Sequence, residues 1–325
     1  MLDKFRRDIR TPKQRYAFPD DLHGGELKQY YFIFSEKRVS SGADQPLISG
    51  FNENGIPVNR TYVDVKDQDH VYFPITIGQM GIAVFHTYLE TKSEQDKDRF
   101  LKFAEWFSDE SNMDMDEHLG VRWLTHVPLP QYNNPGPWPS AFSQSRGISI
   151  LLRGYQLSGE KRYAEIAEKA LESFTVPVKD GGVRSETEWG PFYEEYTAEF
   201  PTLVLNGMIF SLCGIYDFVR VFPGNIQARK IYEDGIRTLE NILPQYDLGF
   251  WSKYNLCADA RYPEIDPATI AYQRLHVDQL EMLYRLTEKA IFKRYADIFR
   301  RQDTFSSAVK MYRIKYSALK KIGRL

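Results

Sequence analysis

The sequence has few cysteines for its length, only Cys213 and Cys257 among 325 residues. This number excludes a disulfide framework and a cysteine-based zinc cluster, and it is typical of a reducing compartment. The sequence also lacks an excess of charge, because 42 Lys and Arg residues balance 44 Asp and Glu residues to a formal net charge of -2. That balance argues against a nucleic-acid partner, which would favour a basic chain.

Signals for secretion or for crossing a membrane are missing as well. Residues 1–10 are rich in charge and contain no apolar stretch, unlike a secretory signal. The most apolar window, residues 200–219, is interrupted by Asn206 and Asp217, so it predicts a buried helix and not a membrane span. We therefore expect a cytoplasmic location.

Motifs for metals and common cofactors are equally scarce. The six histidines are scattered without the spacing of metal ligands. Neither a glycine-rich phosphate loop nor a nucleophile elbow is present. The sequence thus predicts a protein with no metal and no cofactor.

Aromatic residues, by contrast, are abundant, with 5 Trp, 21 Tyr and 21 Phe making up 14% of the chain. One interpretation is a large aromatic core. The other is an aromatic groove, in which flat rings stack on the faces of sugars while tyrosine hydroxyls make hydrogen bonds. Composition alone does not separate these two interpretations.

Four segments begin alike, at intervals of about 62–73 residues: Phe73-Pro74, Trp138-Pro139, Phe200-Pro201 and the degenerate Gln273-Arg274. Proline is favoured in the first turn of a helix, so each pair predicts a helix start. The apolar helices predicted from these starts cover residues 74–90, 139–157, 201–221 and 274–287. A more amphipathic helix follows each, over residues 94–107, 160–174, 225–243 and 290–301, and a last helix covers residues 305–319.

This pattern predicts a mainly α protein, an α/α toroid of about four helical hairpins with apolar helices inside and amphipathic helices outside. Glycine followed by β-prone residues at 119–122, 181–184 and 248–251 predicts short β-hairpins in the loops between the helical hairpins. Residues 1–70 are polar and predict an N-terminal arm with a few strands, packed on an α/α barrel of residues 71–325.

Amides recur at one register of the four apolar helices: Gln79, Gln144, Asn206 and Gln279 lie six residues after the helix starts. A buried amide without a partner costs about 1–3 kcal/mol, so these side chains should either face a central wet cavity or bond loop carbonyls. His276 lies on the same helix face as Gln279. We take all five as candidate substrate-binding residues.

The run WGPFYEEYTAEF at residues 189–200 places two carboxylates between tyrosines, just before an apolar helix. Glu195 or Glu194 could be a base whose pKa is raised by burial and by the second carboxylate. Arg184 and Lys253, in neighbouring loops, are candidate partners for a substrate carboxylate or, alternatively, solvated surface charges.

Several motifs resemble the D-glucuronyl C5-epimerase family over about residues 50–300, in its catalytic helical domain and in a bacterial-type form. They are FYEEY at 192–196, LVLNG at 203–207, SLCGIYD at 211–217, LPQYD at 243–247, YNL at 254–256, and Tyr272 with His276, Asp278 and Gln279. The resemblance implies an α/α barrel, a homodimer, and conversion of D-glucuronate to L-iduronate in heparan-type polysaccharides. It places catalytic residues at Glu195, Tyr196, Tyr254 and Tyr272, and substrate contacts at Gln144 and Asn206.

The sequence also departs from that family. Asn255-Leu256-Cys257 replaces the usual Asp-Leu-Arg, which removes a substrate-binding arginine. We expect neither the membrane anchor nor the separate β-domain of the animal enzymes. Both departures favour short or lightly charged uronate oligosaccharides over long heparosan.

The chemistry of C5 epimerisation explains these residue types. A proton α to a carboxylate is removed and another is returned on the opposite face, so groups are needed on both faces of the sugar. We expect Glu195 or Tyr196 on one face and Tyr254 or Tyr272 on the other. The alternatives are a polysaccharide lyase, which shares the first step, a hydrolase with two carboxylates, and a non-catalytic glycan-binding helical protein.

Overall fold

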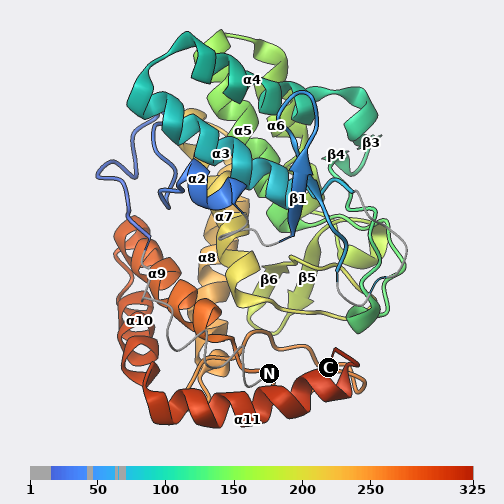
Figure 1. Ribbon diagram of the computed structural model, residues 1–325, viewed down its shortest axis with the longest axis vertical. Helices are drawn as coiled ribbons and strands as arrows, with labels where there is room; N and C mark the ends of the chain where they lie inside the picture. The colour runs from blue at the N-terminus through green and yellow to red at the C-terminus, as the bar shows by residue number, and fades with distance from the viewer. Residues whose placement is uncertain (1–15, 42–46, 63–64, 66–70, 325) are drawn as a thin grey trace.

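The computed structural model describes residues 16–41, 47–62, 65 and 71–324, and this part of the chain is mainly helical (Figure 1). The predicted toroid-like arrangement of four helical hairpins is confirmed. The inner helices are α3 (Pro74–Thr91), α5 (Ala141–Ser158), α7 (Leu205–Val221) and α9 (Ile270–Thr287). The outer helices are α4 (Glu94–Ser108), α6 (Lys161–Lys169), α8 (Ile226–Ile242) and α10 (Ala290–Gln302), and α11 (Phe305–Lys321) follows them. Helices α10 and α11 lie at the end of the molecule opposite α3 and α4.

Helices α3, α5 and α7 are buried along most of their length, as their apolar composition requires, whereas α9 exposes Ala271, Tyr284 and Arg285. Helix α5 packs between α3 and α7, and α7 also contacts α9. Two glycines allow these helices to approach closely. A Cβ atom at Gly78 of α3 would lie 2.4 Å from the Cβ of Arg146 on α5, and one at Gly214 of α7 would lie 2.3 Å from the carbonyl oxygen of Ser145. Any side chain at either position would separate the helices.

Polar N-caps define where several helices begin. The Ser93 hydroxyl accepts a hydrogen bond from the backbone N–H of Asp96 in α4, and Asn225 accepts one from Ala228 in α8. Such caps satisfy backbone donors that the first turn leaves without partners. The outer helices then expose one charged face. None of the described helices is long and apolar enough to cross a lipid bilayer.

The N-terminal segment connects the first and last inner helices. The backbone N–H of Tyr16 donates to Oδ2 of Asp278 on α9 at 3.1 Å. Further along the segment, the backbone N–H of Tyr30 lies 2.9 Å from Nε2 of His86 on α3, and the ring of Phe34 stacks against the same histidine. Residues 16–34 therefore pack into the helical body, whereas residues 1–15 of the predicted arm lie outside the described residues.

Short antiparallel strand pairs occupy the loops. In the arm, α2 (Glu36–Ser40) precedes β1 (Ile48–Phe51), which pairs with β2 (Pro57–Asn59). Between helical hairpins, β3 (Asp114–Asp116) pairs with β4 (Gly120–Arg122), and β5 (Arg184–Thr187) pairs with β6 (Gly190–Tyr193). Single 3-10 turns complete the loops: η1 (Glu110–Asn112), η2 (Pro130–Tyr132), η3 (Glu172–Phe174), η4 (Val178–Asp180) and η5 (Leu243–Tyr246).

Two sequence predictions about local structure need correction. The third predicted β-hairpin, at residues 248–251, is reduced to a single bridge between Asp247 and Ser252. The shared helix register is also wrong, because α7 begins only at Leu205, after an irregular stretch, while α9 already begins at Ile270 with Thr269 as its N-cap. The four amides therefore lie at different depths in their helices.

Candidate active site

A pocket of about 260 Å³ lies where the first two turns of all four inner helices converge. We call it the central pocket. Its lining is mostly aromatic and apolar: Tyr16, Phe34, Leu47, Tyr62, Phe73, Ile75, Thr76, Gln79, Thr125, Trp138, Phe142, Glu195, Tyr196, Asn206, Phe210, Tyr272 and Leu275. Helix N-termini carry partial positive charge, so four of them around one pocket favour a negatively charged ligand. In the described residues, neither lysine nor arginine lines it.

Glu195 provides the carboxylate of the central pocket and is only 5% exposed. Burial raises its pKa to about 7, and hydrogen bonds from Tyr196 and Asn206 oppose part of that rise. The Asn206 bond joins Nδ2 to Oε2 of Glu195 at 3.3 Å. Gly207 makes room for the carboxylate, because a Cβ atom there would lie 2.3 Å from Oε2. A carboxyl with a pKa near 7 is suited to general base catalysis at neutral pH.

Three tyrosines of the pocket surround this carboxylate. Burial, followed by the charge of Glu195, raises the pKa of Tyr62, Tyr196 and Tyr272 above the usual value. All three phenols therefore stay protonated at neutral pH and can donate a hydrogen bond or a proton. They come from three separate parts of the chain, since Tyr62 is in the N-terminal arm, Tyr196 precedes α7 and Tyr272 is in α9.

Glu194, the second carboxylate of the pair, points away from the central pocket. Its oxygens accept from the hydroxyls of Ser185 and Thr202, both at 2.7 Å, and from the backbone N–H groups of Thr202 and Leu203 at 3.1 and 2.9 Å. Leu203 adopts a positive φ of 50° at this point. The Glu194 carboxylate thus fixes the irregular stretch before α7, and its described hydrogen bonds are all made within the protein.

The four amides divide into two groups. Gln79 and Asn206 line the central pocket, as one of our two interpretations expected. Gln144 and Gln279 instead bond carbonyl groups of the protein, as the alternative interpretation expected. Gln144 accepts from the backbone N–H of Trp123 at 3.0 Å and donates to the carbonyl of Val121 at 2.7 Å. Nε2 of Gln279 donates to the Asn206 carbonyl at 2.9 Å.

The remaining predicted residues lie around the pocket and not in its lining. The Tyr254 ring contacts the Tyr272 ring, with centroids 5.2 Å apart. His276 is fully buried; its Nδ1 lies 2.9 Å from the Ser252 hydroxyl, and burial lowers the pKa of its imidazole to about 3. Lys253 forms an isolated antiparallel β-bridge with Pro267.

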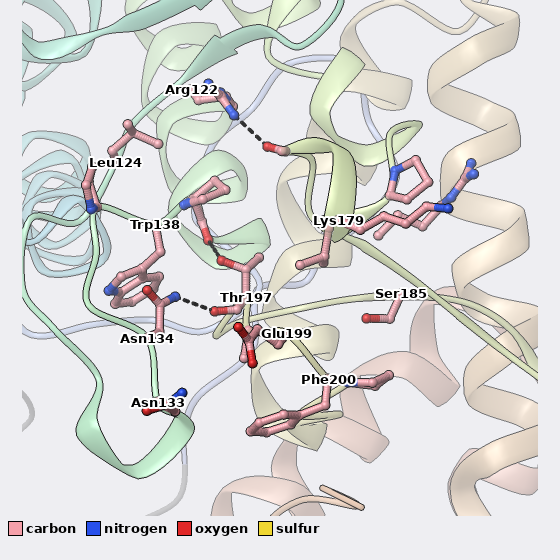
Figure 2. Close-up of a pocket in the computed structure, with 18 of the residues that line it drawn as sticks. Arg122, Leu124, Asn133, Asn134, Trp138, Lys179, Ser185, Thr197, Glu199 and Phe200 are labelled. Atoms are coloured by element: carbon pink, nitrogen blue, oxygen red, sulfur yellow. Dashed lines mark hydrogen bonds between the residues drawn. The ribbon is translucent and has the colours of Figure 1, made fainter. Parts of the chain in front are cut away.

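Figure 2 shows a second hollow, of about 760 Å³, whose lining includes residues 197–201. Residues 195 and 196, directly before them, line the central pocket. Trp138 lines both. Arg184 lies here and pairs with Glu186 at 2.7 Å. The exposed Lys179 side chain borders the same hollow, and Asn134 donates to the Thr197 carbonyl at 2.6 Å. The hollow is more open than the central pocket, and its lining carries charges of both signs.

Sequence reasoning missed Tyr62 and Tyr16. Both belong to the polar first 70 residues, where no periodic pattern marks them. The Tyr62 ring stacks on Phe73 with centroids 5.3 Å apart, so the packing of the arm on α3 brings its hydroxyl into hydrogen bonding with Tyr196 and within range of the Glu195 charge. The aromatic excess was the only signal that pointed to such residues.

Comparison with known proteins identifies the family of this chain. The family model described as the D-glucuronyl C5-epimerase C-terminus matches residues 116–301, which include Glu195, Tyr196 and Tyr272. The chain belongs to this family. It is 29% identical over 240 residues to a D-glucuronyl C5-epimerase of Caenorhabditis elegans, covering 69% of this chain and 38% of that protein. It is 27% identical over 287 residues to an uncharacterized protein of Methanocaldococcus jannaschii, covering 78% of this chain and 90% of that protein.

The chain thus spans well under half of the worm C5-epimerase but nearly all of the Methanocaldococcus protein. The family match covers the part of the helical body that holds Glu195. Cys257 stands where the family usually has an arginine. It is 7% exposed and belongs to a buried cluster with Tyr132, Tyr262 and the pocket residue Trp138.

Proposed function

We propose that this protein is a uronyl C5-epimerase, which interconverts D-glucuronate and L-iduronate units of a glycan. The observation that carries the proposal is Glu195, a buried carboxyl with a pKa near 7, in an aromatic pocket with phenols that remain protonated. Groups whose pKa values are pushed apart in one site are suited to act as base and acid. Membership of the family supports the same reaction.

In the proposed reaction the ionised Glu195 carboxylate takes the proton from C5. The electron pair of that C–H bond moves into the substrate carboxylate, where hydrogen bonds must stabilise the added charge. Tyr272 then gives its phenolic proton to C5 from the opposite face. Tyr196 is hydrogen-bonded to Glu195 and belongs with the base, whereas Tyr272 comes from α9, a different element.

The central pocket suits a single sugar ring with an acidic group. Its volume of about 260 Å³ is at the small end for ligand sites. Gln79 and Asn206 can donate from their amides to a carboxylate, and four helix N-termini add a favourable field. Gln144, Gln279 and His276 are not among the proposed substrate contacts, because they do not line the central pocket. Neighbouring sugars would occupy the larger hollow.

A lyase remains the second candidate, because it needs the same base and the same stabilised intermediate. A hydrolase with Glu194 and Glu195 as its pair fits less well, since the Glu194 oxygens already accept four hydrogen bonds within the protein. The homodimer and the cytoplasmic location remain predictions.

Product analysis tests the proposal. A glucuronate-containing tetrasaccharide is incubated with the protein, and the products are followed by proton NMR and ultraviolet absorbance. We expect L-iduronate signals at constant chain length with no new absorbance. An unsaturated uronate that absorbs in the ultraviolet would identify a lyase, shorter saturated products would identify a hydrolase, and unchanged substrate would contradict all three.

A further inference from the structure

Arg146, in the second turn of α5, is a fully buried cation. Two other buried arginines, Arg153 and Arg220, both pair with the carboxylate of Asp217. Within the described part of the chain, Arg146 makes no ion pair. Its Nε and Nη1 groups also have no hydrogen-bond partner there. A buried charge is costly unless something compensates it, so this guanidinium needs an explanation.

Aromatic rings compensate the charge only in part. The guanidinium carbon lies 4.8–5.6 Å from the centroids of four rings, those of Tyr30, Phe34, Phe142 and Phe210. The negative faces of such rings attract a cation, though less strongly than a carboxylate does. Phe34, Phe142 and Phe210 also line the central pocket. The charge therefore lies directly behind the pocket wall, in a region of low polarity where its field is weakly screened.

One hydrogen bond connects Arg146 to the pocket itself. Its Nη2 donates to Oε1 of Gln79 at 2.7 Å, and Gln79 lines the pocket. Because arginine can only donate, this bond fixes which end of the amide is the oxygen. Nε2 of Gln79, which makes no hydrogen bond to the described residues, is left as a free donor. Gly78, next to Gln79, makes room for the Arg146 stem.

We propose that Arg146 and Gln79 form the carboxylate-recognition element of the central pocket. Gln79 donates from Nε2 to the substrate carboxylate, and Arg146 is a positioning residue that orients this amide and supplies the unpaired positive charge. The inference rests on the proposed function for the identity of the ligand. It explains how a pocket without lysine or arginine in its described lining can select an acidic sugar, and why Arg146 has no carboxylate of its own.

A binding experiment separates this inference from the catalytic proposal. Calorimetry compares a non-sulfated glucuronate tetrasaccharide with the same tetrasaccharide as its methyl ester, which keeps the shape and removes the charge. The parent protein should bind the acid at least about 10-fold more tightly than the ester. A parent that binds both equally would overturn the inference.

Gln79→Glu is the most selective variant, because the new carboxylate pairs with Arg146 and repels the acid. We expect acid binding to fall at least about 10-fold, ester binding to stay unchanged, and the melting temperature to hold or rise. Arg146→Met should reduce acid affinity to the level of the ester, and Arg146→Lys should restore part of the preference. Arg294→Met, which removes one exposed charge on α10, is the matched control and should change neither affinity.

An acid preference that survives in both Gln79→Glu and Arg146→Met would overturn the inference. If Arg146→Met does not fold, Gln79→Glu alone decides, because it retains the arginine. Hydrogen exchange at C5 is measured on the parent separately. A parent that prefers the acid but exchanges no C5 hydrogen would contradict the proposed function and leave the carboxylate-recognition element standing.

Discussion

Asn206 donates a hydrogen bond from Nδ2 to Oε2 of Glu195 across 3.3 Å. The backbone carbonyl of the same asparagine accepts from Gln279 on α9 at 2.9 Å. The first turn of α7 is thereby tied to the neighbouring inner helix while its side chain supports the proposed base. Oδ1 of Asn206 has no hydrogen-bond partner among the described residues, so this acceptor is available to a ligand in the pocket.

Asn206→Leu should therefore affect chemistry more than stability. The substitution removes a hydrogen bond that favours the ionised form of Glu195, so the pKa of that carboxyl rises further. We expect the rising limb of the rate against pH to move to higher pH and the melting temperature to change little. An unchanged limb together with a large fall in melting temperature would show a purely structural asparagine.

Gln144→Leu should give the opposite result. This amide bonds the backbone of residues 121 and 123 and the carbonyl of Ala170, all in the protein interior. Removing it leaves buried donors and acceptors without partners, at a cost of about 1–3 kcal/mol in the free energy of unfolding. Denaturant unfolding measures that loss. The KM of the folded variant should stay at the parent value. A raised KM with unchanged stability would show that Gln144 contacts the substrate.

Tyr272→Phe tests the proposed acid. Loss of a hydroxyl that transfers a proton should lower kcat by about 10²–10⁴-fold with little loss of stability. Tyr254→Phe is the natural comparison, because its ring contacts that of Tyr272 but does not line the central pocket. We expect a smaller loss of kcat there. Equal activity of Tyr272→Phe and the parent would contradict the role of Tyr272.

The raised pKa of Glu195 predicts how activity and stability depend on pH. Activity needs the ionised base, so kcat/KM should rise with pH through about 7. Stability changes in the opposite direction. Between the ordinary carboxyl pKa of 4.5 and the folded value, the native state holds more protons than the unfolded state, so stability falls as pH rises.

Glu195→Gln removes this titration. The variant should lose the acid limb together with the activity, and it should be more stable than the parent at pH 8 by up to about 3 kcal/mol but not at pH 4. Glu194, whose pKa is also raised to about 7 by burial, titrates in both proteins and cancels in the comparison. A stability difference that does not depend on pH would contradict the raised pKa of Glu195.

The sequence predicted the fold well because the spacing of apolar residues along a helix follows which of its faces are buried. The apolar helices and the alternating amphipathic helices appear where their patterns indicated, and α3 begins at Pro74 as the aromatic-proline pair suggested. The same pair at Phe200-Pro201 does not begin α7, because the Glu194 carboxylate holds residues 202–203 in a non-helical conformation, with Leu203 at positive φ. A carboxylate that accepts from backbone groups eight and nine residues further along the chain leaves no periodic signal in the sequence.

The site was predicted only in part, for a similar reason. Glu195 stood out through its acidic and aromatic neighbours, and Tyr272 through the family resemblance. Tyr62 reaches the pocket only because the arm packs on α3, which no spacing in the sequence reveals. Arg146 lies in an apolar helix pattern, where its missing counter-charge becomes visible only after the surrounding chain is placed.

Deuterium incorporation at C5 tests the central claim most directly. A glucuronate tetrasaccharide is incubated with the protein in D2O at neutral pD, and the C5–H signal is followed by proton NMR beside Glu195→Gln as the control. The account predicts that the parent replaces the C5 hydrogen with deuterium in both epimers, without unsaturated product, and that the variant does not. A parent that forms L-iduronate without deuterium at C5, or a variant that exchanges as fast as the parent, would contradict Glu195 as the base that opens the C5–H bond.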